Sequence, residues 1–301
     1  MTQTSPSQRA EAGKALDACP LCGSLSLRPY DFDYRGAKIS CCNACKVRFL
    51  NPQPSDETLG SLYASYDGLT APLQQGEERK MSWLRKRRHR RKRVMSSGEL
   101  CHAYNIGLLE SFSAPGRFLS VGCGTGIDLC VAKERGWQAE GLEIDSDVAA
   151  TTAESTGCVV QHADLLDFDN EGQPFDCMYL NHVLEHPREP GAWLEKAHEL
   201  LAPSGLLWIA CPNIDSLSNR LKTLAGRLSL KARRGKHYAS WHHLFFYSPS
   251  VLARLLQERY GFEVSLVQGE FLPTTGGKLT ERMNRFFPNS KSCFQLIARK
   301  R

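Results

Sequence analysis

The chain has 301 residues, 42% of them hydrophobic, so it is long enough to bury one full-sized core and carry a small accessory module. No signal-peptide pattern opens it and no run of about 18 apolar residues occurs, which argues against secretion and a transmembrane helix. We therefore expect a cytoplasmic protein, at most peripheral to a membrane, whose twelve cysteines stay reduced.

The net charge of +6 is concentrated in one segment. Residues 79–93 hold ten Lys and Arg residues and no acid, which more than accounts for that charge. A second basic run without acids extends from Arg220 to Lys236. Basic runs of this kind bear on which partners a protein binds and not on how the chain folds.

Four regions follow one another along the chain. Residues 1–18 are polar and are predicted to be a disordered leader. Residues 19–54 contain two Cys-x2-Cys pairs and end at a proline-rich boundary, which predicts a zinc-ribbon module. Residues 55–115 are predicted to form a helical bridge that starts with Ser55 as N-cap and carries the basic arm, residues 79–93.

Residues 116–301 alternate between apolar strand patterns and helical patterns, which is typical of a mainly parallel sheet covered by helices. The predicted strands lie near residues 118–121, 139–143, 159–162, 175–180, 206–210, 262–267 and 294–298. After Pro212 the pattern lapses into a long insertion, and a helix is predicted over about 248–260. The sequence thus predicts one α/β domain.

A glycine-rich loop follows the first strand of this domain. It reads Gly122-Cys123-Gly124-Thr125-Gly126, and an amphipathic helix follows. Alternate glycines let the backbone turn and approach a ligand closely, and the helix presents free N–H groups to it. A dinucleotide fingerprint would place its last glycine where Ile127 stands, so pyrophosphate binding is the weaker interpretation.

Carboxylates follow the next two strands. Glu143 lies at a strand end about 20 residues beyond the first glycine, where acidic residues bind a ribose diol. Asp164 follows the third strand and is placed to accept a hydrogen bond from an adenine amino group, with Leu165 packing on the ring. Together with the glycine loop, these residues predict a nucleoside site.

Residues 117–268 resemble the class I S-adenosylmethionine-dependent methyltransferases, notably the ubiquinone-biosynthesis-type enzymes and the methyltransferase 23-like domain. Beyond the loop and its acids, the resemblance rests on Asn181-His182-Val183-Leu184-Glu185-His186, Leu201–Leu206 and Cys211-Pro212-Asn213. It implies a Rossmann-like, doubly wound, mainly parallel seven-stranded sheet. The implied S-adenosylmethionine site consists of Gly122, Cys123, Gly124, Thr125, Gly126, Glu143, Asp164, Leu165 and Asn181. The family usually has Asp where Ser120 stands.

Methyl transfer from a sulfonium is an in-line displacement, so the protein positions the nucleophile and removes its proton. His186 is the predicted base, because an imidazole titrates near neutrality and the resemblance places it at the cofactor's edge. Glu185 would orient His186 or bind a cation. We expect O-methylation of a small-molecule, lipid-linked or sugar-linked acceptor. Some ubiquinone-type relatives bind a divalent metal in this segment, but Asn181 and His182 replace their earlier acid, which argues against a catalytic metal.

A second cluster of histidines and aromatic residues spans Trp241–Phe246. Related enzymes carry a histidine followed by an apolar-aromatic pair at this point, so His242 and His243 are predicted to wall the acceptor pocket and assist catalysis. The sequence does not rank the two histidines. The alternative is that the aromatic residues are core and the histidines are surface groups.

The N-terminal cysteines form two Cys-x2-Cys pairs, Cys19 with Cys22 and Cys42 with Cys45, separated by nineteen residues. This spacing falls in the range of a four-thiolate zinc site. Cys41 is an alternative to Cys42, but Cys42 keeps the spacing to Cys45. Four thiolates leave no site for water, so a zinc ion here would be structural. The segment resembles N-terminal ribbons of some bacterial methyltransferases.

The basic arm leaves three interpretations open: contact with nucleic acid, contact with an anionic membrane surface, or a solvated helix face. The first makes an RNA or DNA methyltransferase the main alternative function. No aromatic ladder for stacking bases accompanies the arm, which argues against it. A second alternative is a non-catalytic, zinc-dependent interaction module, against which the intact motifs argue.

Overall fold

A computed structural model describes residues 13, 15–55, 57–59, 96–228, 235–238, 243–271, 273 and 278–301. The predicted leader, 1–18, therefore lies mostly outside the described residues. The basic arm at 79–93 and His242 lie entirely outside them, so the predictions made for them stay predictions. Among the helices that are described, none has the length and apolar character needed to cross a membrane.

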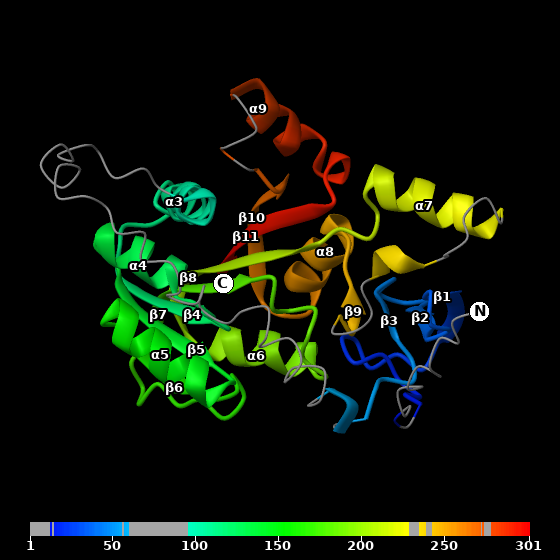
Figure 1. The fold of residues 1–301 in the computed structure, drawn as a ribbon, viewed down its shortest axis with the longest axis horizontal. Coiled ribbons are helices and arrows are strands. Elements are labelled where there is room, and N and C mark those ends of the chain that lie inside the picture. Colours follow the sequence, from blue (N-terminus) through cyan, green and yellow to red (C-terminus); the bar gives the residue numbers. More distant parts are fainter. Residues whose placement is uncertain are drawn as a thin grey trace, which may run out of the picture.

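The larger of two sheets within the described residues has seven strands in the order β10-β11-β8-β7-β4-β5-β6 (Figure 1). Its strands are β4 (Arg117–Val121), β5 (Gln138–Glu143), β6 (Val159–His162), β7 (Phe175–Asn181), β8 (Leu201–Pro212), β10 (Phe262–Gly269) and β11 (Cys293–Lys300). All pairs are parallel except those that β11 makes with β8 and β10. The predicted mainly parallel, seven-stranded sheet is confirmed.

Helices cover both faces of this sheet. The helices that cover it include α3 (Ser97–Leu109), α4 (Ile127–Glu134), α5 (Ser146–Thr156), α6 (Pro190–Leu200) and α8 (Pro249–Glu258). Helices α7 (Leu217–Arg227) and α9 (Lys278–Phe286) both contact the 3-10 turn η2 (Pro288–Ser290), and a further 3-10 turn is η1 (Lys236–Tyr238). Successive strand residues point to opposite faces, so Leu206 and Trp208 join one core with α3 and α4, while Leu207 and Ile209 join the other with α6 and α8.

Two helix starts follow from local sequence. The hydroxyl of Ser55 accepts a hydrogen bond from the Thr58 backbone N–H, as its predicted N-cap role requires. Ser96 caps α3 in a reciprocal capping box with Glu99, which satisfies two backbone donors at once. Of the helical bridge predicted over residues 55–115, the structure describes the helical residues 57–59 and α3.

The N-terminal cysteine module forms a second, four-stranded sheet of β1 (Leu27–Phe32), β2 (Lys38–Cys42), β3 (Arg48–Leu50) and β9 (Phe245–Phe246), at the right of Figure 1. The last strand comes from the α/β region: Phe49 pairs with Phe245 and their rings stack at 5.9 Å. This pairing was not predicted, because the sequence places a module boundary near residue 54.

Side-chain contacts extend the junction between the module and the α/β region. Arg48 forms an ion pair with Asp215 at 2.8 Å, and Arg254 donates to the carbonyl of Cys45 at 2.7 Å. Leu21 and Phe49 are buried in the same core as α6 and α8. The module therefore shares a hydrophobic core with the α/β region.

Candidate active site

The glycine loop connects the carboxyl end of β4 to α4, and its three glycines have positive φ angles of 66°, 50° and 68°. A Cβ at Gly122 would lie 2.9 Å from Val183 Cγ2, and one at Gly126 would lie 2.6 Å from Thr152 Cγ2. At Gly124 a Cβ would meet no atom within 4 Å. The loop is therefore packed on both sides of Gly124 and open at Gly124 itself, where a ligand can approach the backbone.

Glu143 lies at the end of β5, beside this opening. Its Oε2 accepts a hydrogen bond from the Gly124 N–H and its Oε1 accepts one from the Ile144 N–H, both at 2.9 Å. The carboxylate is thereby fixed against the loop. Oε1 also accepts a bond from the Asp145 N–H at 3.4 Å, and Oε2 retains acceptor capacity for a hydroxyl group.

The remaining predicted nucleoside contacts differ in exposure. Asp164 follows β6, and its Oδ1 accepts a hydrogen bond from the Leu166 N–H at 2.9 Å. Leu165 is only 1% exposed and belongs to the core, so it has almost no side-chain surface for an adenine ring. Cys123 is also buried, and burial raises the pKa of its thiol to about 12, while Thr125 is exposed.

An acid that the sequence did not single out lies beneath the loop. The Ser120 hydroxyl donates to the carboxylate of Asp128, which is 5% exposed at the start of α4, and burial raises the pKa of Asp128. Ser120 holds the position where the resembling family usually has Asp. A carboxylate is thus present beneath the glycine loop, but it is carried by α4 and not by β4.

Glu185 is the centre of a cluster at the carboxyl end of β7. Its side chain is 1% exposed, with Oε1 at 3.7 Å from His182 Nδ1 and 3.8 Å from His243 Nε2. The rings of His186 and His243 lie 5.1 Å apart, edge to face. The structure therefore brings together Glu185, His186 and His243, three residues predicted to take part in catalysis.

His182 joins this cluster to a second carboxylate, Glu270, which follows β10. Its Nε2 lies 3.4 Å from Glu270 Oε1. The Cys293 sulfur joins these two side chains in a group whose possible ligand atoms all lie within 4.8 Å of one another. Sequence reasoning missed Glu270 and Cys293, because their approach depends on the pairing of distant strands. The positive φ of 57° at His182 is a local sign of constraint that only the backbone reveals.

Electrostatics fix the charges in the cluster. Burial alone would lower the pKa of His182, but the carboxylates of Glu185 and Glu270 raise it to about 10. Burial likewise opposes ionisation of Glu185 and Glu270, yet contact with His182 holds both their pKa values below the usual range. At neutral pH, His182 is therefore a cation between two carboxylates.

This charge state predicts how stability depends on pH. Because its pKa is raised from about 6.5 to about 10, His182 stabilises the fold fully below pH 6.5 and loses this contribution as the pH rises to 10. Urea unfolding of wild type and His182→Gln at several pH values should show a difference that shrinks over this range. A difference that does not change with pH would contradict the assigned ion pairs.

The segment 181–186 also contacts the second sheet. The backbone N–H groups of Leu244 and Phe245 donate to the carbonyl of Glu185 at 2.8 and 3.1 Å. Since Phe245 pairs with Phe49 of β3, the cysteine module is linked to the backbone of Glu185 through a single strand.

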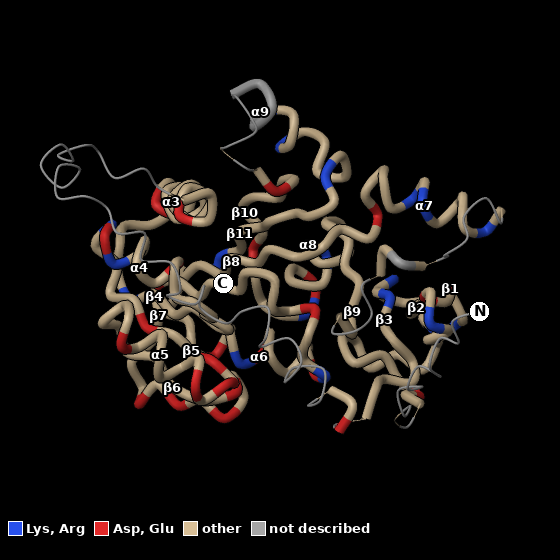
Figure 2. The backbone as a smooth tube through the Cα atoms, viewed as in Figure 1, with Lys and Arg blue, Asp and Glu red and all other residues tan. Residues whose placement is uncertain are grey.

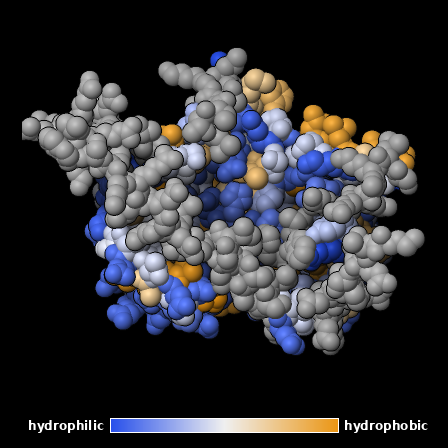
Figure 3. Space-filling model, in the orientation of Figure 1, coloured by the Kyte–Doolittle hydropathy of each residue, from blue (hydrophilic) through white to orange (hydrophobic). Residues whose placement is uncertain are grey.

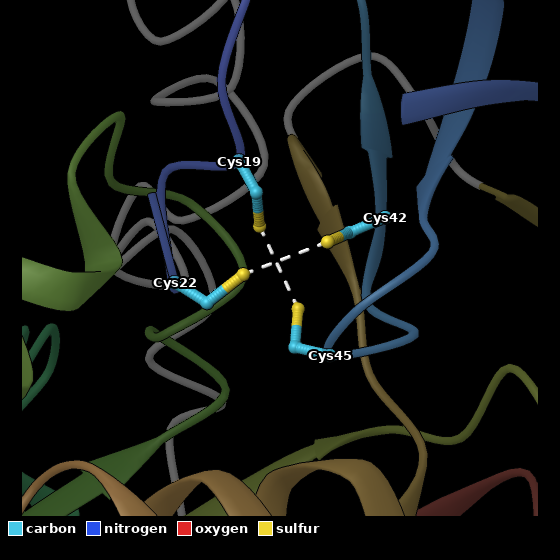
Figure 4. A group of neighbouring side chains, drawn as sticks. All are labelled: Cys19, Cys22, Cys42 and Cys45. Carbon is cyan, nitrogen blue, oxygen red and sulfur yellow. Dashed lines mark hydrogen bonds between the residues drawn. The ribbon is translucent and has the colours of Figure 1, made fainter. Parts of the chain in front are cut away.

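The predicted cysteines converge on one point (Figure 4). Cys19 Sγ lies 3.6 Å from Cys45 Sγ, Cys22 Sγ lies 3.5 Å from Cys42 Sγ, and all four sulfurs lie within 4.8 Å of one another. A tetrahedral zinc ion with bonds of about 2.3 Å places its sulfurs about 3.8 Å apart, so the donor set fits. The Cys41 thiol instead points to the carbonyls of Cys42 and Lys46.

Comparison with known proteins agrees with this architecture. A family model described as "Methyltransferase domain" matches residues 87–267, more than half of the chain. A search among curated proteins finds no match.

Solved structures of similar fold cover most of the chain. The 1,6-didemethyltoxoflavin-N1-methyltransferase of Burkholderia thailandensis, solved with 1,6-didemethyltoxoflavin and S-adenosylhomocysteine, is 17% identical, with a TM-score of 0.51 over 91% of this chain and 99% of that one. A SAM-dependent methyltransferase from Archaeoglobus fulgidus is 21% identical, with a TM-score of 0.48 over 68% and 95%. By its family match and its fold, the chain belongs to the S-adenosylmethionine-dependent methyltransferases of class I.

Proposed function

We propose that this methyltransferase transfers the methyl group to a hydroxyl of a small-molecule, lipid-linked or sugar-linked acceptor, with His186 as general base. The observation that carries the proposal is the buried Glu185 with His186 and His243 beside the glycine loop. The missing side chain of Gly122 lets the loop lie against Val183, within the same short segment as His186. A proton acceptor therefore adjoins the proposed cofactor site.

For the cofactor, we propose the residues expected from the sequence, Gly122 to Gly126, Glu143, Asp164 and Asn181, with Leu165 reduced to a backbone contact. Two features fit S-adenosylmethionine. The backbone is open at Gly124, and Asn181 Oδ1 is buried without a hydrogen-bond donor among the described residues, so it suits an ammonium group. When bound, the cofactor would supply a methyl group on a sulfonium: the acceptor oxygen bonds to the methyl carbon as the carbon–sulfur bond breaks, and the neutral thioether leaves.

The histidines of the cluster take different roles in this proposal. His182 holds its proton at neutral pH between Glu185 and Glu270, so it acts as a fixed cation and not as the base. His186 accepts the proton of the acceptor hydroxyl as the oxygen attacks, and releases it to solvent afterwards. The Glu185 carboxylate stabilises the imidazolium that forms, and His243 walls the acceptor side.

For the N-terminal region, we propose that Cys19, Cys22, Cys42 and Cys45 hold a structural zinc ion. We also propose that the chain is divided into four regions, residues 1–18, 19–54, 55–115 and 116–301. The sheet of the second region is completed by β9, a strand that belongs to the fourth. Against its burial, hydrogen bonds from the Cys45 backbone and the Cys22 thiol lower the pKa of Cys42 to about 7, whereas burial raises the pKa of Cys22 and the Cys19 thiol raises that of Cys45. The support for the zinc ion is therefore the convergence of the four sulfurs.

The function is tested by incubating the protein with methyl-labelled S-adenosylmethionine and a panel of phenols, sugars, lipid-linked hydroxyls and amines. We expect product with a base-stable methyl ether and calorimetric cofactor binding that Gly124→Arg weakens at least about 100-fold, because the new side chain fills the opening. Gly172→Arg, at an exposed turn after β6, is the matched control. Labelled amines without labelled ethers would overturn O-methylation, and tight binding by Gly124→Arg would overturn the cofactor site.

A further inference from the structure

Helix α7 has its apolar face outward. It buries Asn219 and Gly226, and the hydroxyl of Thr223 lies 2.9 Å from His237 Nε2, so a polar and small-residue face packs on the protein. The outward stripe consists of leucines that are 54–63% exposed: Leu217, Leu221, Leu224 and Leu228. Surface helices of globular proteins normally point such a stripe at the core.

A second apolar group lies next to this stripe, at the end of α9. Its side chains are 52–66% exposed: Met283, Phe286 and Phe287. Both helices pack on η2. Asn213 connects η2 to α7: its side-chain amide donates to Asn289 Oδ1 at 3.1 Å, and its backbone carbonyl accepts a hydrogen bond from Asn219 of α7 at 2.8 Å. Figures 1 and 3 show α7 and α9 along one edge of the molecule, with hydrophobic residues gathered there.

The charge of this edge is basic. Within residues 217–228 and 282–287 every charged side chain is a cation: Arg220, Lys222, Arg227, Arg282 and Arg285. Lys278 and Glu281 precede this stretch on α9. Helix α7 contains no acid, and the nearby Asp215 is paired with Arg48. Acidic residues gather instead around α5 and β6, at the opposite edge of the sheet (Figure 2), and Glu270, which follows β10, is paired with His182.

We propose that this α7–α9 surface, residues 217–228 and 282–287, docks on an anionic phospholipid bilayer. Exposed leucines and phenylalanines beside cations are the combination that inserts into the interfacial region of such a bilayer. Nucleic acid would use the cations but leave the leucines exposed. A second copy of the chain would bring α7 against an equally basic α7 in a two-fold contact, without acids to complement it.

This inference does not depend on the acceptor or on His186. Sedimentation of the full chain with vesicles of phosphatidylcholine alone, or with 30% phosphatidylglycerol, provides the test. We expect binding to the anionic vesicles, weakened at least tenfold in a variant with the α7 leucines changed to serine. Arg220→Ser with Lys222→Ser should weaken binding about fivefold per cation at low salt.

Controls separate this surface from others. Leu25 and Val159 are exposed apolar residues on other parts of the molecule, so Leu25→Ser with Val159→Ser should bind vesicles as wild type does. Cofactor affinity should be unchanged in every variant, which establishes that each is folded. Vesicle binding that survives the leucine changes would overturn the proposal, as would no binding at all. A wild-type dimer that becomes monomeric in the leucine variant would instead assign the surface to self-association.

Discussion

Cys42→Ser should remove bound zinc and destabilise the whole chain, lowering the free energy of unfolding by more than about 3 kcal/mol. The effect is expected to exceed that of an isolated module, because the cysteines belong to the same core as α6 and α8. Loss of β3 would also leave β9 without its partner strand and loosen the backbone bonds to Glu185. Metal content by atomic absorption and thermal unfolding by calorimetry provide the measurements.

Cys41→Ser is the matched control, because Cys41 is as buried as its neighbour but its sulfur points away from the cluster. It should keep one zinc per chain and cost about 1 kcal/mol at most, because the serine hydroxyl can donate to the same carbonyls of Cys42 and Lys46. An equal loss of stability in both variants would mean that these cysteines stabilise the chain by being buried and not by binding metal. Protein that is free of metal and fully stable would disprove the structural zinc.

Features encoded within a short stretch of chain could be predicted from the sequence. The central strands β4, β7 and β8 contain apolar runs, and the glycine loop follows directly on β4, so its place at a strand end is fixed by chain order alone. The cysteine group was predictable for the same reason: each pair lies on one turn, and the two pairs can only satisfy a metal together.

Features that depend on distant parts of the chain could not be predicted. Glu270 reaches His182 only because β11 lies between β8 and β10, and β9 joins the ribbon sheet through pairing of residues almost two hundred positions apart. Helix α7 was missed for a different reason. Its leucines recur at helical spacing, but its basic run and its place after Pro212 suggested an irregular insertion, and its stripe faces outward.

His186→Ala should lower kcat/KM for the methylated acceptor by about 10²–10⁴, the usual contribution of a positioned base. Because the change lies outside the glycine loop, the cofactor dissociation constant should change little. His198→Ala, on α6 and away from the cluster, is the control. A variant as active as wild type would move the base to His243.

Glu185→Gln tests the same cluster at a residue that is proposed to stabilise the imidazolium of His186 without touching the acceptor. The amide keeps the shape of the buried side chain but removes the charge that stabilises His182 and an imidazolium at His186, so kcat should fall more than KM changes. Glu140→Gln removes a carboxylate from the Arg117 ion pair on β5 and should leave kcat unaltered. If kcat of Glu185→Gln matched wild type while stability fell, Glu185 would be a purely structural anchor for the 181–186 segment.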